Sequence, residues 1–185
     1  MSTVSVDRVQ TERLLLERLR LEDETEVAIL LRDPRVAKTL TADGLPPTER
    51  EVHDGLRAKI AHWERHGFGL WMVRDAASGE MVGRGGLQHT VVEGAGEIEV
   101  GWAIVPERWG QGLATELARA AVEVAAEPLH VPAIVAFTLP DNIASRRVME
   151  KAGFTYERDV VHVSLPHVLY RLSLRDPGWL GVKRK

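Results

Sequence analysis

Apolar residues recur along the chain with two periods, which predict strands in some segments and helices in others. Between residues 97 and 102 large apolar residues alternate with glutamate or glycine, which is the pattern of a half-buried strand. One face of this predicted strand carries Ile98, Val100, Trp102 and Ile104, and the other carries Glu97, Glu99 and Gly101. Residues 113–125 instead have apolar side chains at steps of three and four, which is typical of a helix with one buried face. The continuously apolar residues 133–138 predict a strand that is buried on both faces.

Start and stop signals indicate where the other elements begin and end. A capping box at Thr48 and Glu51 predicts the start of a helix that Gly67 ends. Further strands are expected over residues 11–19, 68–74, 80–89, 154–163 and 167–174, and further helices from residue 23 and over residues 142–152. This order predicts one mixed α/β (α+β) domain over residues 1–185, with a mostly antiparallel central sheet of about seven strands flanked by helices. The core spans about residues 10–174, and residues 175–185 form a C-terminal tail.

Composition excludes several classes of protein. The 185 residues are 44% apolar and 28% charged, which is ordinary for a globular chain. There is no cysteine, so disulfides, thiolate metal sites and a cysteine nucleophile are excluded. The formal charge of −3 argues against nucleic acid as a partner, because binding by bulk charge needs a basic protein. No signal peptide or membrane-length apolar run is visible, so we expect a cytoplasmic protein without a membrane partner.

The junction between the alternating strand and the helix that follows is the most informative segment. Residues 105–116 read VPERWGQGLATE. A glycine-containing turn at a helix start leaves several backbone N–H groups unpaired and directs the positive end of the helix dipole at one point. Such a turn suits phosphate or pyrophosphate. The spacing matches neither G-x-x-x-x-G-K-[ST] nor G-x-G-x-x-G, which disfavours a P-loop nucleotidase and a Rossmann dehydrogenase. On this segment alone, a turn that needs glycine only for its geometry stays an alternative.

A second strand-to-helix junction, residues 140–154, carries Asn142 at the expected N-terminal cap of a helix. Together with TERLLL at residues 11–16 and the segment 101–116, it resembles the GNAT superfamily of acetyl-coenzyme A-dependent N-acetyltransferases. The resemblance is closer to the branch that contains the Rim-type acetyltransferases of ribosomal-protein N-termini, and it covers about residues 10–174. It implies a sheet that splays apart at the cofactor site, and acetyl-coenzyme A as the co-substrate.

The resemblance also implies roles for individual residues. The coenzyme A loop of the family reads Gln/Arg-x-x-Gly-x-Gly/Ala, and Gly112 and Ala114 match its last two fixed positions, while Trp109 stands where Gln or Arg is usual. The pyrophosphate would then bind backbone N–H groups of Gly110, Gln111, Gly112, Leu113, Ala114 and Thr115. Ile104 and Val105 would pair with the pantetheine arm, and Asn142 would hydrogen-bond it.

Acetyl transfer to an amine needs a neutral amine and a proton for the departing thiolate. Because the chain lacks cysteine, we expect direct attack by the amine. Glu99 is the predicted base and Glu97, on the same strand face, is the reserve; the alternative is that both are solvated or paired carboxylates. An α-amine, with a pKa of about 7.7–8.0, needs less help from a base than a lysine, with a pKa of about 10.4.

The donor of the second proton is less clearly marked. Many GNAT members place a tyrosine seven residues after the asparagine, and here that position is Met149. Ser145 is therefore the candidate acid, with a helix-cap serine as the alternative. No metal is expected. His62 and His66 stand four residues apart, as in H-E-x-x-H, but the glutamate is not at the second position of that motif. Three other histidines, His89, His162 and His167, are interpreted as surface or hydrogen-bonded strand residues, with the lining of an acceptor cleft as the alternative.

The sequence therefore predicts an N-acetyltransferase that acts on a primary amine, either a protein N-terminal α-amine or a small-molecule amine. The alternative is a non-catalytic acyl-coenzyme A-binding sensor module. Residues 21–67 are expected to form one wall of the acceptor cleft, but they carry no motif that identifies the acceptor. Either a monomer or a homodimer is compatible with the sequence.

Overall fold

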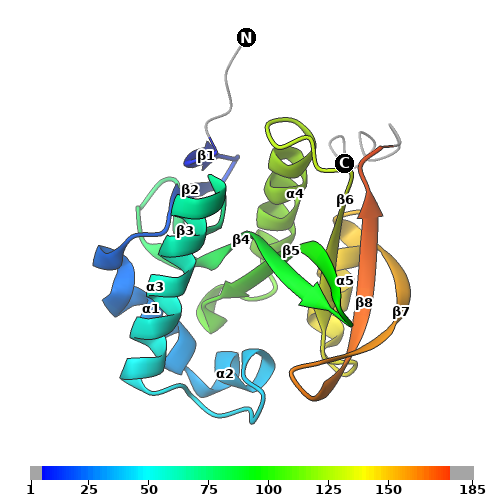
Figure 1. The fold of residues 1–185 in the computed structure, drawn as a ribbon. Coiled ribbons are helices and arrows are strands. Elements are labelled where there is room, and N and C mark those ends of the chain that lie inside the picture. Colours follow the sequence, from blue (N-terminus) through cyan, green and yellow to red (C-terminus); the bar gives the residue numbers. More distant parts are fainter. Residues whose placement is uncertain (1–5, 176–185) are drawn as a thin grey trace.

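Eight strands form one sheet through the molecule (Figure 1). The computed structural model describes residues 6–175. The sheet order is β1-β2-β3-β4-β5-β6-β8-β7, and every neighbouring pair is antiparallel except β5 and β6. The strands are β1 (Arg8–Gln10), β2 (Leu14–Arg18), β3 (Leu70–Asp75), β4 (Met81–Val92), β5 (Ala95–Ile104), β6 (Ala133–Thr138), β7 (Thr155–His162) and β8 (Leu165–Ser173). The predicted mixed α/β fold with a mostly antiparallel sheet is confirmed.

The eighth strand is β1, which the sequence pattern did not reveal because it has only three residues. The Thr11 N–H donates to the Leu14 carbonyl at 2.9 Å, and the resulting turn brings β1 alongside β2. The strand predicted over residues 11–19 is thus a turn followed by β2. The predicted tail falls almost wholly on residues 176–185, which lie outside the described residues.

The helices within residues 6–175 begin and end close to the predicted signals. They are α1 (Glu24–Arg32), α2 (Pro34–Leu40), α3 (Glu49–His66), α4 (Leu113–Ala126) and α5 (Ile143–Lys151), with short 3-10 helices at Leu21–Asp23 and Pro106–Arg108. The α3 capping box forms as predicted: Thr48 Oγ1 accepts the Glu51 N–H at 3.2 Å, and the Glu51 carboxylate accepts the Thr48 N–H at 2.7 Å. Gly67 ends α3 with a φ of 72°, where glycine carries no steric penalty. None of the helices in this range is both long and apolar enough to span a membrane.

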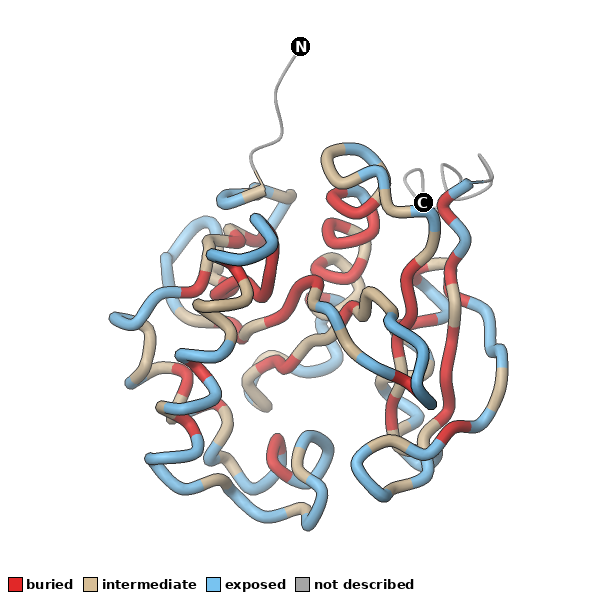
Figure 2. The backbone as a smooth tube through the Cα atoms, viewed as in Figure 1, coloured by how far each residue is buried: buried red, intermediate tan, exposed pale blue. Residues whose placement is uncertain are grey.

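The helices cover the two faces of the sheet separately. α4 lies so close to β4 that a Cβ atom on Gly85 would lie 2.7 Å from Leu117 Cδ2. On the opposite face Met72 of β3 packs with Val27 of α1 and Leu56 of α3. Buried residues concentrate along α4 and the central strands, as Figure 2 shows. The sheet is therefore covered by α4 on one face and by α1 and α3 on the other.

The sheet opens between β5 and β6. Glu99 of β5 lies opposite Val135 of β6, and this is the one register position that the two strands share. Beyond this position β5 continues to Ile104 and β6 continues to Thr138, but the two strands no longer pair with each other. Backbone groups on these two edges need another partner. The predicted splay of the sheet is thus present, and the candidate site lies at its opening.

Candidate active site

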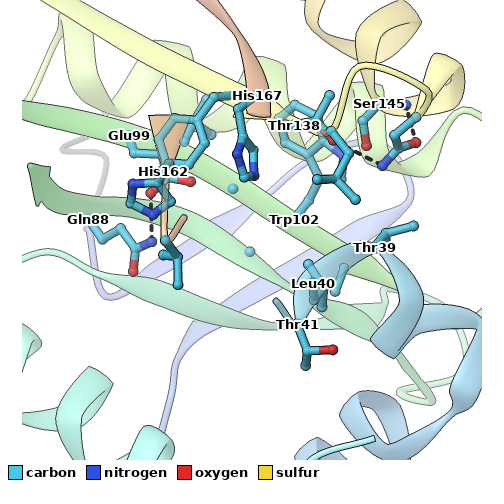
Figure 3. Close-up of a pocket in the computed structure, with 18 of the residues that line it drawn as sticks. Thr39, Leu40, Thr41, Gln88, Glu99, Trp102, Thr138, Ser145, His162 and His167 are labelled. Atoms are coloured by element: carbon cyan, nitrogen blue, oxygen red, sulfur yellow. Dashed lines mark hydrogen bonds between the residues drawn. The ribbon is translucent and has the colours of Figure 1, made fainter. Parts of the chain in front are cut away.

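A cavity of about 310 Å³ lies where β5 and β6 separate (Figure 3). Strands β4 and β5 form one side, β6 and α5 form another, and the end of α2 and the β7–β8 hairpin complete it. Of the predicted site residues, Glu99, Asn142 and Ser145 line this cavity. The other predicted residues, Ile104, Val105 and residues 110–115, are not part of its lining and follow the end of β5. The structure thus brings the predicted base, acid and asparagine together.

A polar relay holds the Glu99 carboxylate. Lys59 Nζ donates to Gln88 Oε1 at 2.5 Å, and Gln88 Nε2 donates to Glu99 Oε2 at 2.9 Å. The other oxygen, Oε1, lies 3.6 Å from the place where a Cβ of Gly101 would stand, so it points along β5 toward the opening. Burial raises the pKa of Glu99, although the Gln88 hydrogen bond and the Lys59 charge act in the opposite direction. A carboxylate in this setting accepts a proton at Oε1 more readily than an exposed one.

Glu97 has a different environment, although it shares a strand face with Glu99. Arg171 donates to both of its oxygens, with Nη2 at 2.7 Å and Nη1 at 3.1 Å. Glu97 is not part of the cavity lining. Its carboxylate is committed to a bidentate ion pair, which leaves Glu99 as the carboxylate that faces the opening.

The turn before α4 offers a cluster of unpaired amides. Gly110 and Gly112 adopt φ values of 75° and 79°, a region that side-chain-bearing residues avoid. Glu116 is the first residue of this segment whose N–H is bonded, to the Gly112 carbonyl at 3.1 Å. The backbone N–H groups of residues 110–115 have no acceptor among the described residues, and no side chain caps the helix. This start of a 14-residue helix fits the pyrophosphate of coenzyme A.

Arg13 lies against this turn, and sequence reasoning assigned it no role. Its Nη1 donates to the Gln111 carbonyl at 2.9 Å, and its Nε donates to Glu116 Oε2 at 2.7 Å. Its Nη2 lies 3.6 Å from the Cβ position of Gly112. Thr11 Oγ1 also donates to Glu116, at 2.6 Å. The only sequence signal was that both residues fall in the TERLLL segment, whose contact with α4 spans about a hundred positions of the chain.

The backbone at the end of β5 determines which groups face the opening. The Val105 N–H donates to the Val82 carbonyl and the Val105 carbonyl accepts the Arg108 N–H, both at 2.9 Å, so neither group is free for a ligand. Because antiparallel pairs alternate between bonded and non-bonded positions, the Val105–Val82 bond implies that the backbone groups of Trp102 and Ile104 face β6. The Ile104 carbonyl accepts the Trp109 indole N–H at 2.7 Å. The geometry therefore points to Trp102 and the Ile104 N–H, rather than Val105, as groups able to pair with an extended arm.

On the opposite side of the opening, Asn142 caps α5 as predicted. Its Oδ1 accepts the Ser145 N–H at 3.2 Å, and its Nδ2 donates to Thr138 Oγ1 at 3.0 Å. One amide hydrogen of Asn142 remains available. Ser145 lines the cavity together with Met149, whose buried thioether has no proton to donate. Ser145 is thus the cavity hydroxyl on the first turn of α5.

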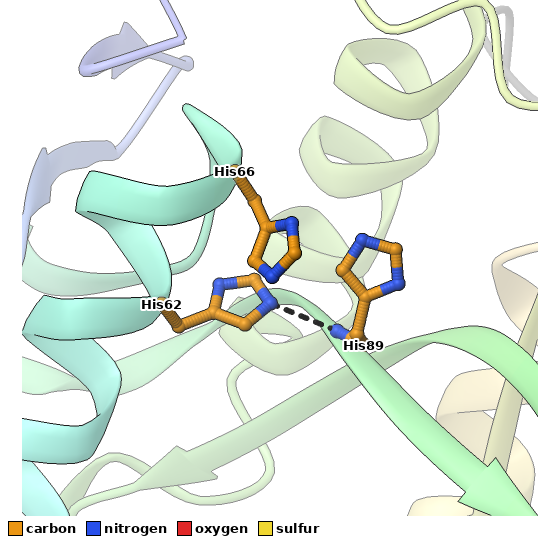
Figure 4. Close-up of side chains that lie close together, drawn as sticks. All are labelled: His62, His66 and His89. Atoms are coloured by element: carbon orange, nitrogen blue, oxygen red, sulfur yellow. Dashed lines mark hydrogen bonds between the residues drawn. The ribbon is translucent and has the colours of Figure 1, made fainter.

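Two of the three candidate cleft histidines, His162 and His167, line the cavity. Burial is the main cause that lowers the pKa of His162, and the charge of the nearby His167 lowers it further. The third, His89, lies instead beside His62 and His66, and the ligand atoms of these three side chains are within 4.8 Å of one another (Figure 4).

Both ring nitrogens of His62 are already hydrogen-bonded to backbone groups in that cluster. Its Nδ1 bonds the Phe68 carbonyl at 2.9 Å, and its Nε2 accepts the His89 N–H at 3.0 Å. A metal ion would have to compete for the same Nε2 lone pair. The sequence showed the spacing of His62 and His66 but not the approach of His89, which depends on the position of β4.

A sheet that splays after one parallel pair, an amide-lined turn at a helix start and a partly buried carboxylate at the opening are the features expected of an acyltransferase that uses coenzyme A. The chain belongs to the GNAT acetyltransferase family, because the family model described as "Acetyltransferase (GNAT) domain" matches residues 13–155. It is accordingly an acetyl-coenzyme A-dependent acetyltransferase.

Individual relatives cover nearly the whole chain. The FsC-acetyl coenzyme A-N(2)-transacetylase of Aspergillus fumigatus is 34% identical over 191 residues, which covers 95% of this chain and 79% of the relative. A GNAT-family acetyltransferase structure from Bordetella pertussis is 25% identical, with a TM-score of 0.78 over 90% of this chain and 99% of that chain. RimL, the ribosomal L7/L12 alpha-N-protein acetyltransferase solved with coenzyme A, shares the fold at 16% identity, with a TM-score of 0.74 over 90% of this chain and 97% of that chain.

Proposed function

We propose that the protein transfers the acetyl group of acetyl-coenzyme A directly to a primary amine, without an acyl-enzyme. The observation that carries this proposal is the Glu99 carboxylate, which is partly buried, fixed through Oε2 and free at Oε1 among the described residues, beside the opening of the sheet. The names of two similar proteins support an amine nitrogen as the acceptor: one is called an N(2)-transacetylase and the other an alpha-N-protein acetyltransferase.

The residues present fit the coenzyme. The unpaired amides of residues 110–115 and the Arg13 guanidinium suit its pyrophosphate. Trp102, the Ile104 N–H and the free amide hydrogen of Asn142 are placed to hold its pantetheine arm between β5 and β6. When bound, acetyl-coenzyme A supplies the thioester whose carbon–sulfur bond is exchanged for a carbon–nitrogen bond.

The proton transfers are assigned to this chain's own residues. Glu99 Oε1 takes the proton that the amine loses, while Gln88 keeps the carboxylate in place through Oε2. Ser145 Oγ supplies the proton that the departing sulfur needs, since the neighbouring Met149 has none. Ser145 regains a proton from solvent in the open cavity, and Glu99 releases to solvent the one that it took from the amine, so the protons balance. A hydroxyl is a weak acid, so we expect this second transfer to contribute less to the rate than the first.

The test is acceptor-dependent release of free thiol. The chain has no cysteine, so every thiol that appears in solution belongs to the coenzyme, and a thiol-reactive dye counts turnover directly. We expect thiol release from acetyl-coenzyme A in the presence of a panel of amines, with acetylated amine formed in equal amount.

A non-catalytic sensor of acyl-coenzyme A is the second candidate, and Met149 at the usual tyrosine position favours it. Tight binding of acetyl-coenzyme A without amine-dependent thiol release would support the sensor and overturn the enzyme proposal.

A further inference from the structure

The cavity contains a cation that no residue within the described range 6–175 neutralises. Arg84 lies on β4 opposite Ala103 of β5, and its side chain lines the cavity. None of the described residues forms a hydrogen bond or an ion pair with its guanidinium. Burial lowers the pKa of Arg84 to about 10, and no carboxylate acts in the opposite direction. Partly buried arginines are normally paired, because an unpaired charge away from water is costly.

Three other partly buried arginines of this chain follow that rule. Arg74 pairs with Asp23 and Glu26, Arg108 pairs with Asp75, and Arg171 pairs with Glu97. The missing partner of Arg84 is therefore specific to the cavity.

A second cation lies close to Arg84. Lys59 of α3 lines the same cavity. Burial is the main cause that lowers the pKa of Lys59, and the positive charge of Arg84 lowers it further. Glu99 is the one carboxylate among the described lining residues, and Gln88 separates it from Lys59. The part of the cavity wall that Arg84 and Lys59 form, on the side of α2 and α3, is thus positively charged.

We propose that Arg84, together with Lys59, binds an anionic group of the acetyl acceptor, so that the acceptor is a small amine that also carries a carboxylate or a phosphate. This inference rests on the proposed function of the cavity. A guanidinium pairs with either group through two parallel hydrogen bonds.

The geometry separates the two ends of such an acceptor. Arg84 and Gln88 are four strand positions apart, roughly 13 Å between Cα atoms. The long side chains of Arg84 and Lys59 reach into the cavity and shorten the distance from the bound anion to Glu99. An amine at Glu99 Oε1 and an anion at Arg84 are therefore several bonds apart.

The phosphates of the coenzyme are not the expected partner of Arg84. Successive strand residues point to opposite faces, and Gly85 faces Leu117 of α4, so Arg84 points away from α4. The turn that fits the pyrophosphate lies at the start of α4 instead.

The experiment uses matched acceptors on the full chain. The probes are ω-amino acids with one to five methylene groups, each paired with its amide, together with phosphoethanolamine paired with ethanolamine. We expect the best anionic probe to have a kcat/KM at least tenfold above that of its neutral partner. The chain length of that probe then reports the distance between the two subsites.

Substitutions assign the preference to Arg84. We expect Arg84→Gln to lower kcat/KM for the anionic probe at least tenfold, to change the value for its neutral partner less than threefold, and to leave the KM for acetyl-coenzyme A unchanged. Arg84→Lys should retain part of the preference. Arg57→Gln, the same change at an exposed position of α3, is the control and should have no effect.

Three outcomes overturn the inference: equal rates for each matched pair, an equal loss for both members in Arg84→Gln, or a loss confined to the KM for acetyl-coenzyme A. A binding measurement separates this failure from a failure of the proposed function. N-acetyl-β-alanine and its amide are titrated calorimetrically into the protein with coenzyme A present. Selective binding of the acid that Arg84→Gln abolishes supports the anion site even if no amine is acetylated, whereas equal binding of acid and amide counts against it.

Discussion

Gln88 Nε2 donates a 2.9 Å hydrogen bond to Glu99 Oε2, so one side chain fixes the carboxylate while the other carboxylate oxygen is left to face the opening. This contact could not be predicted from the sequence, because the two residues lie eleven positions apart on the two strands of a hairpin. Oε2 of Glu99 is thus used to orient the carboxylate, and Oε1 is the oxygen proposed to accept the proton. Consequences for catalysis and for stability follow from this division.

Replacing Glu99 with glutamine removes the proton acceptor and keeps the shape of the side chain. We expect Glu99→Gln to lower kcat by about 100-fold or more, which is typical of a lost general base, and to leave the affinity for acetyl-coenzyme A unchanged. Steady-state kinetics and calorimetry measure the two quantities. Glu97→Gln is the matched control: it should keep near-normal turnover but lower the melting temperature, because Arg171 loses one of its two ion-pair partners and keeps only Glu157. Wild-type turnover of Glu99→Gln between pH 6 and 8 would show that Glu99 is not the base.

Removal of the Gln88 hydrogen bond should move the pH dependence of the reaction. This bond and the Lys59 charge both lower the pKa of Glu99, so Gln88→Leu is expected to raise that pKa further. The ascending limb of kcat/KM then shifts to higher pH, whereas a purely structural effect would lower the whole profile without moving it. Lys59→Met should shift the limb in the same direction. An unshifted limb in both variants would remove Gln88 and Lys59 from the relay.

The burial of Glu99 also predicts how stability depends on pH. Because the folded-state pKa of Glu99 is raised above the ordinary 4.5, the ionised carboxylate destabilises the fold at pH values above both pKa values. We expect Glu99→Gln to have a higher melting temperature than the wild type near pH 8. The difference should shrink as the pH falls through the raised folded-state pKa and then below 4.5, where the carboxyl is protonated in both states. A melting-temperature difference that is independent of pH would contradict this assignment.

The amide-lined turn can be tested with a single methyl group. Gly112→Ala places a Cβ beside the unpaired amides at a φ of 79°, so we expect at least tenfold weaker binding of coenzyme A and a loss of about 1 kcal/mol in stability. The matched control is Gly94→Ala in the β4–β5 hairpin, where φ is 83° and nothing lies within 4 Å of the added methyl. This control carries the same backbone strain and should leave coenzyme affinity unchanged. Equal loss of affinity in both variants would place the effect in the fold rather than in the turn.

The β7–β8 hairpin stores strain beside the cavity. Its two turn residues, Val163 and Ser164, have φ values of 48° and 63°, although a β-branched valine strongly disfavours this region. Asn-Gly is the preferred pair for such a two-residue turn. We therefore expect the double substitution Val163→Asn, Ser164→Gly to stabilise the protein by about 1 kcal/mol, measured by denaturant unfolding. A loss of stability would mean that Val163 contributes more through contacts than it costs through strain.

Local signals in the sequence predicted most of the secondary structure. Thr48, Gly67 and Asn142 each act within a few residues of their own position, and all three perform the predicted capping role. The short strand β1 escaped prediction because its pairing depends on a turn rather than on a run of apolar residues.

The contacts that shape the site are of a different kind. Arg13 reaches Glu116 across 103 positions, and Lys59 reaches Gln88 across 29. Such pairs depend on strand register and on how helices lie over the sheet, which no single segment encodes. The alternation of the strand supplied Glu99 and the family resemblance supplied the role of Asn142. Neither could reveal that Arg171 forms an ion pair with Glu97 or that the Val105 backbone is hydrogen-bonded within the chain.

The parallel neighbours β5 and β6 divide the sheet into two antiparallel units, one of five strands and one of three, that share a single backbone register position. The two units are held together mainly by side chains, above all those of α4, which pack on both sides of this seam. Side-chain packing tolerates small shifts that a ladder of backbone hydrogen bonds would resist. The opening can thus widen or narrow without breaking either unit, and a ligand lodged in it ties the two halves of the molecule together.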